Sequence, residues 1–299
     1  MNNKIVTIEG KKLKLTNLEK KLWPGISKLD LINYFDQMSK YILPYLKDRA
    51  LSMHRFPDGI RGESFFQKNI GEMKLPWMTT KKIRDDEGKT VEYLIANDKA
   101  TLIYLANLAC IELHPWLAKI NDLKHPDFLV LDLDPEGISF EKVVAVAKAS
   151  KKILDRLNIA AYLKTSGIRG LHIFINVGAK YTFDQVKNFA EILAHLIHQE
   201  IPQITSLERL PEKRQHKVYI DWLQNAEAQT VVAPYSPRPT EKASVSTPLE
   251  WQELNKKIDP SDFTIKNIQT RLKTKGDLFQ KLLSEKPVDI KKVLAKFQQ

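Results

Sequence analysis

The stretch that decides the fold is residues 127–134, DFLVLDLD, which a proline and a glycine soon close. Its run of aliphatic residues predicts a buried strand. Because successive side chains of a strand point to opposite faces, Asp132 and Asp134 project from one face and the leucines beside them from the other. Cα atoms two residues apart on a strand are about 6.5–7 Å from each other, a separation that metal ions can bridge. The segment therefore predicts either a divalent-metal site or, as a lone pair of acids often indicates, a strand end that reaches solvent.

Strand and helix patterns interleave along the rest of the chain. Ser27 and Ser139 precede amphipathic stretches and are expected to cap two helices, the second of which ends near Leu157. Hairpins are mixed with helices, without strict alternation, which indicates an α+β fold with a mostly antiparallel or mixed central sheet flanked by helices. Further helices are expected at about 99–108, at 182–200 and after Thr247, and strands at 51–56, 64–67, 90–95, 161–164, 171–176 and 217–222.

The composition indicates a basic, folded protein. The 299 residues include 47 Lys and Arg against 36 Asp and Glu, a net charge of +11, and 43% are hydrophobic, which is enough for a sizeable core. One cysteine, Cys110, cannot form an internal disulfide or a Cys-based zinc cluster. With no signal peptide or membrane span in view, we expect a cytoplasmic protein without a membrane partner. The positive charge favours a polyanionic partner such as nucleic acid, although basic proteins without one share this composition.

A third acid, Asp221, lies in the strand-like segment 218–222, again at the end of an apolar run. Three carboxylates at strand ends can hold two divalent ions for phosphoryl or nucleotidyl transfer. Ligands that are all oxygen atoms favour Mg²⁺ or Mn²⁺ over structural zinc. By themselves the three acids fit a nuclease as well as a polymerase.

The segment 165–172, TSGIRGLH, lies between two expected strands and has the chemistry of a phosphate cradle. Its glycines allow close approach of the backbone, Ser166 and the amides offer donors, Arg169 offers a permanent charge, and His172 follows on the next strand. It is not a Walker loop, because it has no Gly-Lys-Ser/Thr and no helix directly after it. The alternative is a glycine hairpin with an incidental arginine.

Together and in this order, these elements resemble the archaeo-eukaryotic primase superfamily, and specifically the polymerase domain of bacterial ligase D in its stand-alone form. The acid-x-acid pair at 132–134 is similar to the family's first motif, residues 166–172 to its Ser-x-x-x-Gly-x-His motif, and Asp221 with the following Trp-Leu-Gln-Asn to its third acid. The resemblance extends to 15–17, 55–59, 65–68, 112–116 and 233–238.

The resemblance implies a primase-polymerase fold and a set of site residues. Asp132, Asp134 and Asp221 would hold two Mn²⁺ or Mg²⁺ ions, with a nucleoside triphosphate as the substrate. His114 would lie near the primer terminus or sugar, the alternative being a packed histidine beside Trp116. The triphosphate ligands would be Ser166, Arg169, His172 and Arg238, with Arg214 and Gln224 as weaker matches.

The resemblance also implies a surface for DNA ends in the N-terminal part of the chain. Lys20 and Lys28 would grip a 5′-phosphate across a gap, and at His54 some relatives have a lysine in that phosphate pocket. Phe65 and Phe66 are adjacent, so one ring at most can be buried in a strand. The exposed ring would meet the template strand, by stacking on a base or wedging a downstream end.

We therefore expect a single domain over residues 1–299, with DNA-end binding at about 1–120, a catalytic core at about 121–245 and a helical C-terminal part at 246–299. The expected activity is template-directed extension of DNA 3′ ends with nucleoside triphosphates, ribonucleotides preferred, in gap filling and end joining. Gapped duplex with a 5′-phosphate, Ku and a separately encoded ATP-dependent DNA ligase are the partners that the resemblance implies. A two-metal nuclease and a non-catalytic DNA-end-binding module are the alternatives, and a role in excision repair stays open.

Overall fold

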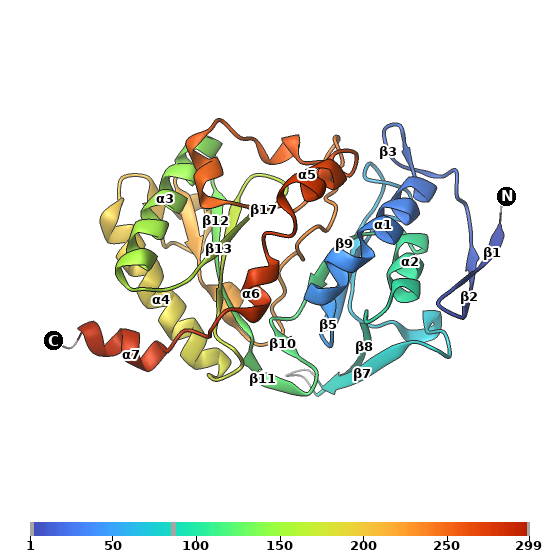
Figure 1. The fold of residues 1–299 in the computed structure, drawn as a ribbon, viewed down its shortest axis with the longest axis horizontal. Helices are drawn as coiled ribbons and strands as arrows, with labels where there is room; N and C mark the ends of the chain where they lie inside the picture. Colours follow the sequence, from blue (N-terminus) through green and yellow to red (C-terminus); the bar gives the residue numbers. More distant parts are fainter. Residues whose placement is uncertain (1–2, 85–87, 298–299) are drawn as a thin grey trace.

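Two β-sheets with helices packed against them lie side by side in the computed structural model, which describes residues 3–84 and 88–297 (Figure 1). One sheet comes mainly from the first 120 residues and the other from the middle of the chain. The described residues form two large hydrophobic clusters, one centred on the N-terminal sheet and the other on the sheet from the middle of the chain. No helix among the described residues is long and apolar enough to cross a membrane.

The sheet from the middle of the chain has six strands in the order β15-β16-β12-β14-β13-β17. All neighbours are antiparallel except β15 and β16, which confirms the mixed sheet expected from the sequence. Helices α3 (Phe140–Arg156) and α4 (Phe183–Glu200) pack on one face. The strands are β12 (Phe128–Pro135), β13 (Tyr162–Thr165), β14 (Leu171–Asn176), β15 (Thr205–Ser206), β16 (Val218–Asp221) and β17 (Pro248–Leu249).

Strand β12 divides its side chains between the two clusters. Leu129, Leu131 and Leu133 pack with α3 and α4, whereas Phe128 and Val130 on the opposite face belong to the cluster of the N-terminal sheet. Asp132 and Asp134 continue this second face, as the alternation predicted. The acids therefore lie where the two halves of the molecule meet.

The N-terminal sheet is antiparallel in the order β6-β5-β8-β7, with β9 also paired to β5. Helix α1 (Lys28–Leu46) begins with a capping box between Ser27 and Asp30, as expected, and α2 (Lys99–Asn107) begins after Asp98. The strands are β5 (Ala50–Arg55), β6 (Phe65–Gln67), β7 (Thr79–Arg84), β8 (Thr90–Ile95) and β9 (Cys110–Pro115).

Several short elements were not predicted from the sequence. The hairpin of β1 (Lys4–Ile8) and β2 (Lys11–Leu15) is rich in exposed lysine, so its apolar pattern is weak. Strand β7 is also largely exposed, and its apolar pattern is equally weak. Ser139 occupies the N-cap position of α3, but its side chain makes no capping hydrogen bond. The remaining unpredicted hairpins are β3 (Lys21–Trp23) with β4 (Ile26–Ser27) and β10 (Ala118–Lys119) with β11 (Asp122–Pro126).

The C-terminal segment contains three short helices that pack against both halves. Helices α5 (Ile268–Lys275) and α6 (Gln280–Ser284) place Ile268, Leu272 and Leu282 in the cluster of the N-terminal sheet. Helix α7 (Ile290–Leu294) places Ile290 and Val293 in the other cluster. Figure 1 shows this red segment running from one half to the other.

Candidate active site

A cavity of about 310 Å³ opens on the acid-bearing face of β12. It brings together side chains that are far apart in the sequence, including most of the predicted metal and triphosphate ligands. Asp221 and Arg214 are next to these residues without being part of the lining. The predicted residues that line the cavity are His114, Asp132, Asp134, Ser166, Arg169, His172, Gln224 and Arg238.

The three acids meet through strand pairing. Asp132 on β12 is directly opposite Asp221 on β16. Asp221 is oriented by the backbone N–H of Leu223, which donates to Oδ1 at 2.8 Å, and by Gln224 Nε2, which donates to Oδ2 at 3.2 Å. Asn225, four residues after Asp221, exchanges hydrogen bonds with both backbone groups of Val130 and so ties this turn to β12.

The electrostatics of the acids favour a bound cation. Burial, with Asp134 and Asp221 close by, raises the pKa of Asp132 well above its usual range. Burial also raises the pKa of Asp134, although Arg169 and Arg214 oppose the change. Among the described residues, no hydrogen-bond donor serves the buried Oδ1 of Asp132. The three acids offer only oxygen ligands, and one of these, the buried Oδ1 of Asp132, accepts no hydrogen bond from these residues. Such a set fits Mg²⁺ or Mn²⁺, the ions implied by the family resemblance.

The loop between β13 and β14 is built around its serine and glycines. Ser166 Oγ accepts hydrogen bonds from the backbone N–H groups of Gly170, at 2.9 Å, and Ile168, at 3.3 Å. Gly167 has φ +84°, and a Cβ on Gly170 would lie 2.6 Å from the carbonyl oxygen of Leu133. The loop therefore packs tightly on β12 and presents Arg169 at the cavity, as expected of a phosphate cradle.

His172 is buried beside the acids. In the sheet, His172 on β14 pairs with Asp132 on β12 and with Lys164 on β13. Its Nε2 is 3.4 Å from Asp132 Oδ1. Burial, with Lys164 and Arg238 nearby, lowers the pKa of His172 well below its usual range, so the ring is neutral at pH 7. Its buried Nδ1 has no hydrogen-bond partner within the described ranges, which suits contact with a ligand.

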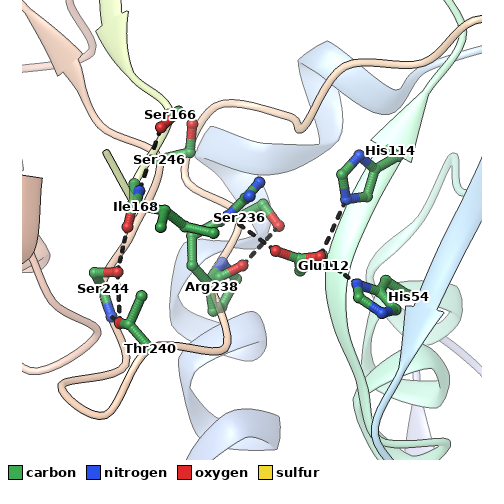
Figure 2. Close-up of polar contacts among 12 residues, drawn as sticks. His54, Glu112, His114, Ser166, Ile168, Ser236, Arg238, Thr240, Ser244 and Ser246 are labelled. Carbon is green, nitrogen blue, oxygen red and sulfur yellow. Dashed lines mark hydrogen bonds and ion pairs between the residues drawn. The ribbon is translucent and has the colours of Figure 1, made fainter. Parts of the chain in front are cut away.

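Arg238 enters the cavity from the loop after β16 and is held by a buried carboxylate, Glu112. Its Nε is 2.9 Å from Glu112 Oε1 (Figure 2). The other oxygen, Oε2, contacts His54 Nδ1 and is 3.4 Å from His114 Nε2. Glu112 is only 3% exposed. This role of Glu112 was not predicted from the sequence, because His54 and Arg238 are far from it in the chain.

The predicted cationic residues for a 5′-phosphate form a group at the C-terminal end of α2. Lys28 is buried and its Nζ donates to the carbonyl oxygen of Asn107 at 2.9 Å, while Lys20 pairs with Asp58 at 2.6 Å. Burial, with the charges of Lys20 and Arg55, lowers the pKa of Lys28 to about 8. Arg55, which donates to the carbonyl oxygen of Leu108, is thus an additional member of the group. His54 instead contacts Glu112 and Phe66.

Both adjacent phenylalanines are exposed, Phe65 at 45% and Phe66 at 57%. At most one of the two rings was expected to be buried, and neither is. Strand β6 is at the edge of the sheet, and its two phenylalanines are exposed on both of its faces. Phe66 stacks on His54 at 4.0 Å between ring centroids, and Arg55 lies over Phe65 at 5.4 Å.

Comparison with known proteins identifies the family. The sequence profile of the LigD primase-polymerase domain matches residues 27–279. The chain belongs to the LigD primase-polymerase family. The bifunctional non-homologous end joining protein LigD of Bacillus subtilis is 34% identical over 89% of the chain, and the multifunctional LigD of Pseudomonas aeruginosa is 32% identical over 82%. These matches span only 43% and 29% of the two LigD proteins.

A solved LigD structure has the same fold. The polymerase domain of Mycobacterium tuberculosis ligase D, in complex with DNA, superposes with a TM-score of 0.84 at 27% identity. The match covers 92% of this chain and 99% of that domain. The primase-polymerase fold expected from the sequence is confirmed, and so is the enzyme class, because LigD polymerase domains are DNA-directed nucleotidyltransferases.

Proposed function

We propose that this chain is a template-directed polymerase that extends DNA 3′ ends with nucleoside triphosphates during DNA repair, in gap filling and end joining. The observation that supports this most directly is that three acids and a basic, glycine-rich loop face one cavity. A nuclease would use the acids alone, whereas Arg169, His172 and Arg238 add a set of donors for a triphosphate. A non-catalytic end-binding module would need no acids.

Each group has a proposed part in the reaction. Arg169, His172 and Arg238 bind the phosphates, with Ser166 shaping the loop and Gln224 orienting Asp221. His114, which lines the cavity, would lie close to the sugar or primer terminus. When bound at Asp132, Asp134 and Asp221, divalent ions, Mn²⁺ or Mg²⁺, would supply charge that favours in-line displacement. Arg214, with its guanidinium over the Tyr219 ring at 4.0 Å, adds positive charge beside Asp134.

The DNA would reach this cavity from the N-terminal sheet. Lys20, Lys28 and Arg55 would bind a downstream 5′-phosphate, while Phe65, Phe66 and His54 would meet the template strand. The polymerase domain of Mycobacterium tuberculosis ligase D was solved in complex with DNA, which supports DNA as the ligand of this chain. We also propose a preference for ribonucleotides, and Ku and a separate ATP-dependent ligase as partners.

One experiment separates the three functions. The protein is incubated with a 5′-phosphorylated gapped duplex, Mn²⁺ or Mg²⁺, and labelled ribo- or deoxyribonucleoside triphosphates. We expect template-dependent extension, with ribonucleotides used at lower concentration. Shortening of the labelled strand would indicate a nuclease, and binding without either reaction would indicate an end-binding module. An Asp134→Ala variant that extends DNA normally would disprove the acid assignment.

A further inference from the structure

A second cluster of metal-ligating side chains lies outside the three acids. His54 on β5 is opposite Glu112 on β9, and His114 is two residues further along β9, so it shares a face with Glu112. One ligand atom from each residue lies within 4.8 Å of the other two. Figure 2 shows both imidazole rings turned toward the Glu112 carboxylate.

The pKa shifts of Glu112 and His114 agree with the metal binding that the geometry suggests. Burial raises the pKa of Glu112, but hydrogen bonds from His114 and His54 and the charge of Arg238 outweigh it, so the pKa is held well below its usual range. Burial lowers the pKa of His114, against the opposing effect of Glu112. An ionised carboxylate next to a neutral imidazole gives a metal ion the protonation states that it needs.

Outer contacts hold the ligands in orientation. Glu112 Oε1 is occupied by Arg238 at 2.9 Å, which leaves Oε2 for the two histidines. His54 Nε2 is 3.2 Å from Ser64 Oγ, so its Nδ1 is directed at Glu112. Phe66 stacks on His54 and packs edge-on against His114 at 5.3 Å. In metalloproteins the ligands are usually oriented by hydrogen bonds from neighbouring residues and surrounded by apolar side chains.

We propose that His54, Glu112 and His114 bind one divalent ion of the zinc class, at a site separate from Asp132, Asp134 and Asp221. Two imidazole nitrogens and one carboxylate oxygen are a donor set typical of zinc. The 3.4 Å between His114 Nε2 and Glu112 Oε2 is close to the edge of a zinc tetrahedron, about 3.3 Å for bonds of about 2.0–2.1 Å. The contact between His54 Nδ1 and Glu112 Oε2 is shorter than this edge, so the distance between these two atoms would increase when the ion binds.

This ion would join the two sides of the active site. Glu112 holds Arg238, which lines the nucleotide cavity, and His54 supports Phe66 on the exposed side. The fourth coordination position would take water or an anionic oxygen. Binding of the ion should therefore stabilise the pairing of β5 with β9 and be measurable without nucleotide or DNA.

The test uses the full chain, stripped with a chelator, with Asp132→Asn and Asp134→Asn introduced to remove the other metal site. Zinc affinity is measured by competition with a chromophoric chelator, and coordination from the visible spectrum after Co²⁺ substitution. We expect one bound ion per chain and a tetrahedral cobalt spectrum. His54→Ala and Glu112→Gln should each weaken binding by roughly tenfold or more.

His125→Ala is the matched control, because His125 is a more exposed histidine that also faces a carboxylate, Asp122, at 2.9 Å. Its zinc affinity should equal that of the parent. His54 is partly exposed, so its removal tests the site even where Glu112→Gln fails to fold. Equal zinc affinity in the parent and in His54→Ala would overturn the proposal. Neither outcome depends on polymerase activity.

Discussion

Asp132 on β12 is directly opposite Asp221 on β16, although the two are 89 positions apart in the chain. On its other side Asp132 is opposite His172, which is itself opposite Lys164 on β13. Directly opposed residues of neighbouring strands share a face, so four ionisable side chains cross four strands in one row. The acidic end of this row is the proposed metal site, and its basic end faces Arg238.

The like charges at Asp132 should make the metal-free protein less stable than its neutral variant. We expect Asp132→Asn to raise the melting temperature without metal, because burial and the nearby acids penalise the ionised carboxylate. A gain of about 1 kcal/mol would correspond to roughly 2–4 °C. The same variant should lose nucleotide addition and the stabilisation that Mn²⁺ gives to the wild type. Thermal unfolding with and without Mn²⁺ measures both; a variant still stabilised as strongly by Mn²⁺ would contradict the assignment.

Gly170 should be intolerant of any side chain. An added Cβ would lie 2.6 Å from the Leu133 carbonyl oxygen, so Gly170→Ala must displace the β13–β14 loop from β12. Small misplacements of binding groups can cost up to about a hundredfold in rate, and we expect kcat/KM for the triphosphate to fall by roughly tenfold to a hundredfold. Gly10→Ala is the control for backbone strain without a clash, because φ +76° disfavours a side chain at Gly10 although nothing lies within 4 Å of the added Cβ. Steady-state kinetics that are unchanged in Gly170→Ala would disprove the cradle.

The preference for a 5′-phosphate should depend on the charge of Lys28. Because burial and the charges of Lys20 and Arg55 lower its pKa to about 8, Lys28 is protonated below pH 8 and loses its charge above it. The phosphate itself stays ionised over this range. We expect the ratio of affinities for phosphate and hydroxyl ends to fall between pH 7 and 9.5 by about tenfold, the value of one charge-assisted contact.

Titrations of paired gapped duplexes at several pH values measure this ratio. Lys28→Met should show little preference at any pH, since it keeps the buried volume without the charge. Lys28→Arg should show a preference that does not fall above pH 8. A wild-type ratio that is constant across the range would remove Lys28 from the phosphate site.

Phe66 should contribute to DNA binding and little to folding. Its ring is 57% exposed and stacks on His54, so a template base can stack on its free face. Base stacking is worth about 1–3 kcal/mol, and we expect Phe66→Ala to weaken binding of a duplex with a 3′ overhang by roughly 5-fold to 150-fold. Phe297→Ala removes another exposed ring, 47% exposed, near the C-terminus. The idea fails if both variants bind the overhang equally well.

Local patterns were sufficient for much of the fold. Alternation along 127–134 predicted that Asp132 and Asp134 share a face, and the capping motif at Ser27 predicted the start of α1. Both properties depend on residues within one turn or one strand of each other. The β1–β2 hairpin was missed because it buries few side chains: Ile5 is 74% exposed, and only Leu13 and Leu15 of the two strands are buried.

Contacts between distant segments required the tertiary structure. From the sequence, Glu112 is an acid in an apolar segment. Its contacts with Arg238, His54 and His114 form only when β5, β9 and the loop after β16 come together. The exposure of both Phe65 and Phe66 likewise depends on which elements pack beside β6 in the folded chain. Which face of a strand a side chain occupies is set by neighbours in sequence, whereas what that face meets is set by strand pairing over long loops.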